Sequence, residues 1–191
     1  IFEFYTKTGE ASSRPTLADK ELIGDLTPEF FGGLGNVITH KNLSLSFMFQ
    51  FSKGTTRNWL AALYSQSVVP GQTMNLPVQA LARWQKPGDI ADLQKFTTNS
   101  SALFSAPTRN FVNSTGAYTE STYARLKMVS FSYSLPDRYL KRLSLKGLQF
   151  YINAENLFVI SGFEIGDPES VSSLFTQPLQ RTIVGGLSLT L

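Results

Sequence analysis

The chain has 191 residues, of which 42% are hydrophobic and only 16% are charged. The charged share is well below the roughly 25% of ordinary soluble domains, so the chain either has a large core or does not meet water on all sides. The absence of cysteine excludes disulfides and thiolate metal sites, and a net charge of +3 without a basic stripe argues against a nucleic-acid partner.

Six stretches are predicted to be β-strands because apolar and small polar residues alternate along them with a period of two. They lie at residues 1–6, 34–39, 43–52, 123–135, 148–160 and 181–191. The clearest is 43–52, where a large apolar side chain occupies every odd position. This run is about ten residues long, against roughly five or six for a typical soluble strand.

The connections between these strands alternate in length. Residues 7–33, 53–120 and 161–180 form long loops, whereas residues 40–42 form a tight turn and residues 136–147 a short link. Long loops are unusual inside a compact domain. The alternation is typical of transmembrane β-barrels, which have short turns on the periplasmic side and long extracellular loops.

A tilted strand of about ten residues is long enough to cross the roughly 25 Å apolar layer of a membrane. The fold class predicted is therefore all-β, a transmembrane antiparallel β-barrel. Asn153 and Glu155 are candidates to face a wet lumen, although a contact between neighbouring strands explains them equally well. The apolar residues expected to face lipid are Leu43, Leu45, Phe47, Phe49, Phe51, Phe131, Leu187 and Leu189.

The alternative fold is a soluble β-sandwich that serves as a glycan-binding or adhesin module. A sandwich also has an apolar inner face, but its outer face usually carries lysine, glutamate and arginine, and these strand interiors are nearly uncharged. A helical membrane span is not expected either, because the uncharged run at 58–82 contains Pro70, Gly71 and Pro77.

The residue types that carry catalysis or bind metals are sparse. The only histidine, His40, lies in the predicted tight turn, and one histidine without cysteine cannot form a zinc site. An oxygen-only calcium site around Asp167 and Glu169 is conceivable, but their spacing matches no known calcium loop. The sequence leaves room for a carboxylate pair of the glycosidase type. We expect no enzyme and no cofactor.

The long 53–120 loop contains both tryptophans beside planar polar groups, a combination that suits sugars and peptides. The candidate ligand-contacting residues are Trp59, Arg83, Trp84 and Asp89. A structural explanation is also available, because Trp59 could pack a short helix in the sequence RNWLAALYS against the rim. Trp84 lies in RWQKPGD, which could equally serve to shape the loop.

Six strands are too few for a membrane barrel, since the smallest have eight, and an open sheet edge cannot face lipid. We therefore expect this chain to be the C-terminal piece of a larger barrel. Four segments in order resemble the SusC/RagA-like TonB-linked outer-membrane transporters. They are IGDLTPEFFGGLGNVITHKNLSLSFMFQFSKG at 23–54, ARWQKPGDIADL at 82–93, STYARLKMVSFSYSLPDRYLKRLSLKGLQFYINAENLF at 121–158 and QPLQRTIVGGLSLTL at 177–191.

This resemblance implies a 22-stranded barrel with an N-terminal plug, of which the chain would hold the last six strands. The whole protein would import glycan oligomers or peptides across the outer membrane of a Gram-negative bacterium of the Bacteroidetes. It would use TonB, contacted through its N-terminal part, and a SusD-like surface lipoprotein as a lid, which the 53–120 loop would contact. One departure is Leu191, which stands where such barrels usually end in an aromatic residue.

Overall fold

The computed structural model describes residues 1–65, 71, 75–98, 102–163, 165–170 and 176–191. The chain divides into two compact units. A helical unit comprises residues 1–26, 56–119 and 170–176, and a sheet unit comprises residues 27–55, 120–169 and 177–191. Most of the regular structure in the sheet unit is one antiparallel β-sheet, which fits the predicted all-β class.

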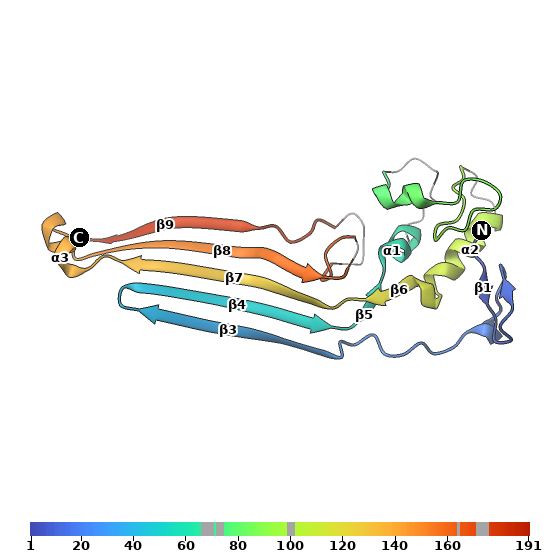
Figure 1. Ribbon diagram of the computed structural model, residues 1–191, viewed down its shortest axis with the longest axis horizontal. Coiled ribbons are helices and arrows are strands. Elements are labelled where there is room, and N and C mark those ends of the chain that lie inside the picture. The colour runs from blue at the N-terminus through green and yellow to red at the C-terminus, as the bar shows by residue number, and fades with distance from the viewer. Residues whose placement is uncertain (66–70, 72–74, 99–101, 164, 171–175) are drawn as a thin grey trace. The chain divides into compact units, whose positions relative to one another are not determined.

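The sheet unit is built from five long strands that lie side by side (Figure 1). Each strand pairs with its neighbour in antiparallel fashion. The strands contain 9 to 15 residues, which matches the length needed to cross a membrane at a tilt. In spatial order they are β3 (Phe30–His40), β4 (Leu43–Lys53), β7 (Tyr123–Ser134), β8 (Gly147–Ser161) and β9 (Thr182–Thr190).

Two short connections join strands at one end of this sheet, which we call the turn end. Lys41 and Asn42 link β3 to β4, and Lys41 has a positive φ of 54°, as a tight hairpin requires. Residues 135–146 link β7 to β8 and contain the helix α3 (Asp137–Leu143). The left-handed Ser144, with φ of 55°, ends α3.

The prediction that residues 1–6 form a strand of the large sheet is wrong. Only β1 (Phe4–Tyr5) is extended, and it pairs with β2 (Ala11–Ser12) in a separate two-stranded sheet. The period of two at this end of the chain has another cause, because Phe2 and Phe4 pack against the core of the helical unit. The large sheet therefore has five strands within the described residues, one fewer than predicted.

The predicted long loops contain regular structure. β3 begins at Phe30 and so includes the last residues of the predicted 7–33 loop. The 3₁₀ turn η1 (Leu17–Asp19) lies near the middle of that loop. The 53–120 segment contains two α-helices and two short strands that pair with each other. Its elements are β5 (Thr55–Arg57), α1 (Trp59–Ser65), η2 (Val78–Ala82), α2 (Ala102–Val112), η3 (Thr115–Ala117) and β6 (Tyr118–Glu120).

The helical unit has its own hydrophobic core around α1. Leu63 is fully buried, and Tyr64 is 5% exposed. The ring of Phe2 stacks on Phe111 with a centroid distance of 4.7 Å. Other core residues are Leu60, Ala61, Ala80, Leu93 and Ala117. None of the helices in the described part of the chain is long and apolar enough to cross a membrane.

The strand register divides the side chains of the large sheet between two faces, because directly paired residues point to the same side. We call them the apolar face and the polar face. The apolar face carries Leu34, Ile38, Leu43, Leu45, Phe47, Phe49, Phe51, Leu126, Val129, Phe131, Phe150, Ile152, Phe158, Ile183, Leu187 and Leu189. The polar face carries Ser44, Ser46, Gln50, Tyr123, Arg125, Ser130, Ser132, Gln149, Asn153, Glu155, Thr182 and Ser188, together with the apolar Phe31, Val37, Met48, Met128, Val159 and Val184.

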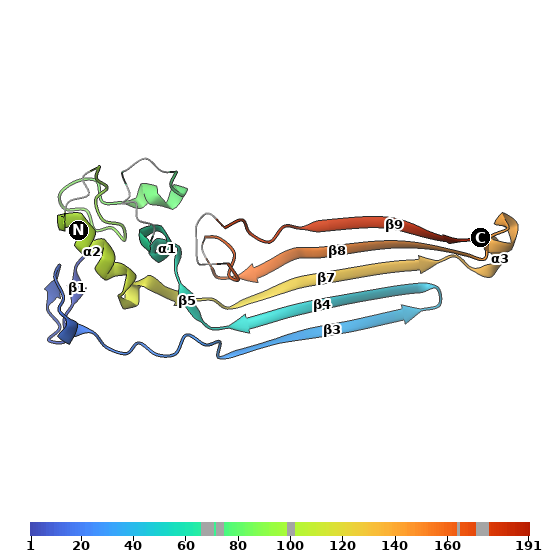
Figure 2. The same cartoon turned by 180° about the vertical axis from the view of Figure 1, so that it is seen from behind.

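The sheet unit is a single layer. Among its described residues, no helix or second sheet lies over either face, as the front and rear views show (Figure 2). Ile38, Ile183 and Leu187 on the apolar face are therefore 53%, 69% and 61% exposed. A soluble sandwich would bury such residues under a partner sheet, so this arrangement disfavours the sandwich alternative.

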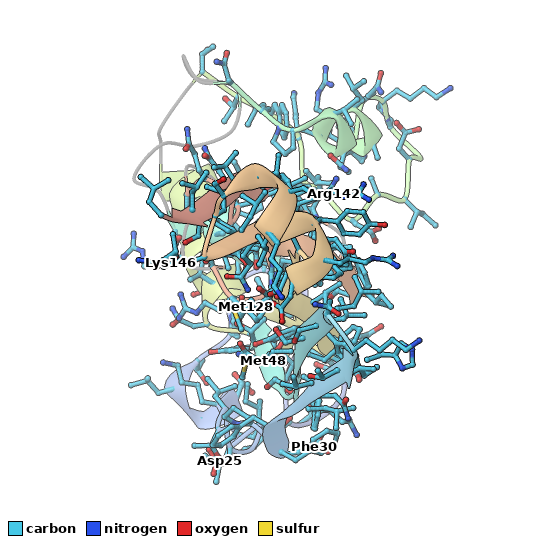
Figure 3. The ribbon with its side chains drawn as sticks, turned by 90° about the vertical axis from the view of Figure 1, so that its left-hand side faces the viewer. Asp25, Phe30, Met48, Met128, Arg142 and Lys146 are labelled. Atoms are coloured by element: carbon cyan, nitrogen blue, oxygen red, sulfur yellow. The ribbon has the colours of Figure 1, made fainter. Side chains whose placement is uncertain are left out.

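An irregularity in β7 reverses the alternation along this strand. Met128 pairs with Met48, but Leu126 pairs with Phe49, so Lys127 is an extra residue relative to β4. Figure 3 looks along the sheet from its turn end and labels Met48 and Met128. Beyond this bulge the odd residues Arg125 and Tyr123 lie on the polar face with Gln50, whereas simple alternation would put them on the apolar face.

Candidate functional site

Four charged side chains form an ionic cluster at the end of the sheet opposite the turn end. Arg125 and Lys127 come from β7, and Asp167 and Glu169 come from the segment that follows β8. The two cations balance the two carboxylates, so the cluster has no net charge. The burial of Arg125, which is only 2% exposed, requires such compensation, because an isolated buried charge is very costly.

Arg125 contacts both carboxylates. Its Nη2 donates a hydrogen bond to Oδ1 of Asp167 at 2.5 Å, and its Nε lies 2.9 Å from Oε2 of Glu169. The second contact is an ion pair without hydrogen-bond geometry, since the Nε atom is buried and has no hydrogen-bond partner. Asp167 is therefore the principal partner of Arg125.

Glu169 gathers three further polar side chains. Lys127 Nζ donates to Oε2 at 3.0 Å, while the Tyr123 hydroxyl and Gln50 Nε2 donate to Oε1 at 2.9 and 3.0 Å. Gln50 Nε2 also lies 3.1 Å from the Tyr123 hydroxyl oxygen, to which it can donate. Side chains from two adjacent strands thus converge on one loop carboxylate.

Asp167 also organises the backbone around it. Its Oδ1 accepts a hydrogen bond from the Glu169 N–H at 3.0 Å, and its Oδ2 accepts one from the Leu179 N–H at 3.3 Å. Burial alone would raise the pKa of Asp167, but these N–H groups and the Arg125 guanidinium outweigh burial and hold the pKa below its ordinary value. Asp167 is thus ionised at neutral pH and joins both ends of the β8–β9 loop.

These contacts indicate a structural role for the cluster. Both carboxylates are held by cations, which leaves Asp167 and Glu169 poorly suited to the calcium site considered from the sequence. Within the described ranges, no three histidine, aspartate or glutamate side chains lie close enough together to hold a metal ion. The cluster instead fastens residues 165–169 and Leu179 to the polar face of the sheet, as a latch would.

The four candidate ligand-contacting residues lie in the helical unit, and each has a contact of its own. Trp59 packs against the hydrophobic core around α1. The Arg83 guanidinium lies 5.1 Å from the ring centroid of Phe96. Ligand contact by these residues stays a prediction.

The RWQKPGD segment is shaped by Asp89 and Trp84. Asp89 Oδ2 accepts hydrogen bonds from the backbone N–H groups of Gln85 and Lys86 at 3.0 and 2.9 Å. Lys95 Nζ lies 5.9 Å from the ring centroid of Trp84. The backbone N–H of Trp84 donates to the backbone carbonyl of Leu93 at 3.0 Å. These contacts support the loop-shaping role that was considered for this segment from the sequence.

The two candidate lumen-facing residues share the polar face with the ionic cluster. Asn153 pairs with Ser130 across the strands, and the Ser130 hydroxyl donates to Asn153 Oδ1 at 2.6 Å. Glu155 is exposed and lies between Met128 and Thr182 in the register. All eight residues expected to face lipid lie together on the apolar face.

Sequence reasoning missed Gln50, Tyr123, Arg125 and Lys127 as parts of a site. Strict alternation gives the odd residues of β7 to the apolar face, and the bulge at Lys127 reverses this for Tyr123 and Arg125. A signal was present, because the alternation of β7 breaks where the apolar Leu126 and Met128 flank Lys127.

Comparison with known proteins confirms the resemblance noted from the sequence motifs. No protein-family model matches the chain. The chain is 28% identical over 173 residues to TonB-dependent receptor P3 of Formosa agariphila, and 23% identical over 151 residues to TonB-dependent receptor P26 of the same organism. These alignments cover 89% and 79% of the chain but only 15% and 14% of the relatives.

The chain is also similar in fold to solved structures. The chain matches the RagAB peptide importer in its open-open state with a TM-score of 0.66 and 19% identity, over 99% of this chain and 20% of that one. The closed-closed state gives a TM-score of 0.61 and 20% identity, over 98% and 20% of the two chains. The chain therefore spans about one fifth of the length of the solved chains and has the fold of the corresponding part.

Proposed function

We propose, on the basis of the similarity to TonB-dependent receptors, that this chain forms part of the barrel wall of an outer-membrane nutrient importer. The observation that carries the proposal is the single-layer sheet. Its strands are long enough to cross a membrane, one face is predominantly apolar and uncovered, and the other carries most of the polar and all of the ionic-cluster side chains. Both curated relatives are named as receptors, and transport rather than catalysis is the activity that we assign.

In this proposal the apolar face contacts lipid and the polar face lines the lumen. Leu187 and Leu189 are 61% and 48% exposed, which is costly in water and favourable in hydrocarbon. Asn153 and Glu155 then face the lumen. The ionic cluster would hold residues 165–169 and Leu179 against the lumen side of the wall, and so narrow the path of the solute.

The two outer strands of the sheet, β3 and β9, support a larger barrel. Each has a neighbour on one side only within the described sheet, and backbone N–H and C=O groups on the other side need partners if they lie in a membrane. Further strands of the complete barrel would supply these partners, up to the 22 that the resemblance implies. A plug and a TonB-contacting segment would belong to that larger protein.

The imported solute belongs, in this proposal, to the glycan oligomers or peptides. The structural relative RagAB is a peptide importer, which supports the peptide alternative. A SusD-like surface lipoprotein would act as the lid, with Trp59, Arg83, Trp84 and Asp89 of the 53–120 segment as candidates to contact the lid or the solute. The location would be the outer membrane of a member of the Bacteroidetes, in keeping with the Formosa relatives.

Spin labelling of the whole protein in lipid tests this orientation. Because the chain contains no cysteine, Phe47→Cys and Ser46→Cys can each introduce a nitroxide label on one side of β4. We expect the label at 47 to be accessible to oxygen, which is concentrated in hydrocarbon, and the label at 46 to be protected from oxygen. If residue 47 is shielded from both oxygen and a water-soluble nickel reagent, it lies in a protein core and the proposal is refuted.

A further inference from the structure

The turn end of the sheet is strongly basic. Two connections contribute five exposed cationic side chains, which we call the basic rim: Lys41, Arg138, Lys141, Arg142 and Lys146. Residues 135–147 contain a single acid, Asp137. Within the described part of the chain, no carboxylate forms an ion pair with any member of the rim.

Helix stabilisation accounts for only part of this charge. Lys141 and Arg142 lie in the last turn of α3, where a cation interacts favourably with the helix dipole. Lys41 lies in a different connection, and Lys146 follows the end of the helix. Figure 3 looks onto this end of the sheet, where Arg142 and Lys146 are labelled beside α3.

Apolar and aromatic side chains adjoin the basic rim. The last rows of the apolar face bring Leu43, Phe150 and Leu187 to the turn end, with exposures of 39%, 45% and 61%. On α3, Leu143 is 57% exposed. The Arg138 guanidinium lies 4.5 Å from the ring centroid of Tyr139 and donates to its hydroxyl at 2.8 Å. Cations beside exposed apolar and tyrosine side chains are typical of a membrane–water interface.

We infer that the basic rim is a docking surface for the phosphate headgroups of anionic phospholipids in the leaflet at the turn end. The inference rests on the proposed function, because the sheet must cross a membrane for the rim to reach headgroups. Charge complementarity supports the inference. Uncompensated lysine and arginine side chains attract an anionic lipid surface, and the contributions of the individual residues add together. The exposed Leu143 and the end of the apolar face would contact the acyl chains of the same lipids.

The test uses native mass spectrometry of the whole protein with phosphatidylglycerol or phosphatidylcholine of matched acyl chains. We compare the triple variant Lys141→Gln, Arg142→Gln, Lys146→Gln with a control that removes three exposed lysines of the helical unit, Lys7→Gln, Lys20→Gln, Lys86→Gln. The rim variant should bind phosphatidylglycerol at least about tenfold more weakly. The control variant should bind it as the unmodified protein does.

Three results would overturn the inference. The rim and control variants could bind phosphatidylglycerol equally well, or phosphatidylcholine could bind as tightly and lose as much affinity in the rim variant. Displacement of phosphatidylglycerol by millimolar inorganic phosphate would instead identify a site for free anions. Failure of the proposed function gives a different outcome, because neither lipid would then be retained and the label at residue 47 would not meet oxygen.

Discussion

Replacement of Asp167 by asparagine keeps the size of the side chain and removes the charge that compensates Arg125. Both side chains are almost completely buried, at 3% and 4% exposed. Loss of one partner from a buried ion pair typically costs about 3–5 kcal/mol, because the other charge stays uncompensated. Glu169 Oε2 remains 2.9 Å from Arg125 Nε, so we expect the lower end, about 3 kcal/mol.

This cost should appear as local opening of the β8–β9 loop. Asp167 accepts hydrogen bonds from the N–H groups of Glu169 and Leu179, so both amides lose protection when the loop leaves the sheet. Since every 1.4 kcal/mol is a factor of ten, about 3 kcal/mol corresponds to roughly hundredfold faster exchange. This increase in exchange rate can be measured by hydrogen–deuterium exchange of the whole protein, followed in peptides that cover residues 165–180.

The matched control is Lys127→Gln, which removes a cation from the same cluster. Lys127 is 28% exposed, and a partly solvated ion pair contributes about 1 kcal/mol or less. Exchange in residues 165–180 should therefore rise less than about tenfold in this variant. The reasoning is refuted if Asp167→Asn leaves exchange unchanged, or if both variants change it equally.

Two further predictions concern acidity and packing. The pKa of Asp167 lies below its ordinary value, so its stabilisation is complete above the unfolded pKa and is lost as pH falls through the folded pKa. Acid should thus release the loop in the unmodified protein. In Asp167→Asn, exchange corrected for its intrinsic pH dependence should rise less steeply with acid, because only Glu169 then remains as a carboxylate in the cluster. A β-carbon at Gly186 would overlap the hydroxyl end of the Tyr151 side chain, whereas one at Gly185 meets nothing closer than 3.9 Å. Gly186→Ala should therefore lower the heat-unfolding midpoint, read from gel mobility, more than Gly185→Ala, and equal midpoints would contradict this reasoning.

The main strands could be predicted because their physics is local. Along 43–52, successive side chains point to opposite faces of the sheet, and the two faces have different surroundings. Apolar and small polar residues therefore alternate in the sequence with a period of two. The same pattern misled at residues 1–6, where Phe2 and Phe4 alternate because they pack against helices. A short alternating run does not say which neighbour buries it.

The ionic cluster depends on contacts that no local pattern encodes. Asp167 lies 42 residues from Arg125 along the chain, and Gln50 lies 119 residues from Glu169. Their meeting requires the register of β4 and β7 and the path of the loop after β8. Arg138, Lys141, Arg142 and Lys146 lie close together in the sequence, but their position beside the exposed end of the apolar face depends on the assembled sheet.

The bulge at Lys127 reverses the alternation of faces in one part of β7 only. Every residue between Lys127 and the start of the strand changes sides relative to strict alternation, while the residues after it are untouched. Deletion of this single lysine would leave the two faces unchanged, because Leu126 already pairs with Phe49 and Arg125 with Gln50. A residue inserted between Arg125 and Leu126 would instead move Arg125 to the apolar side, opposite Phe51, and leave Asp167 without its cation. The chain length between these two residues is therefore more tightly restrained than the bulge itself.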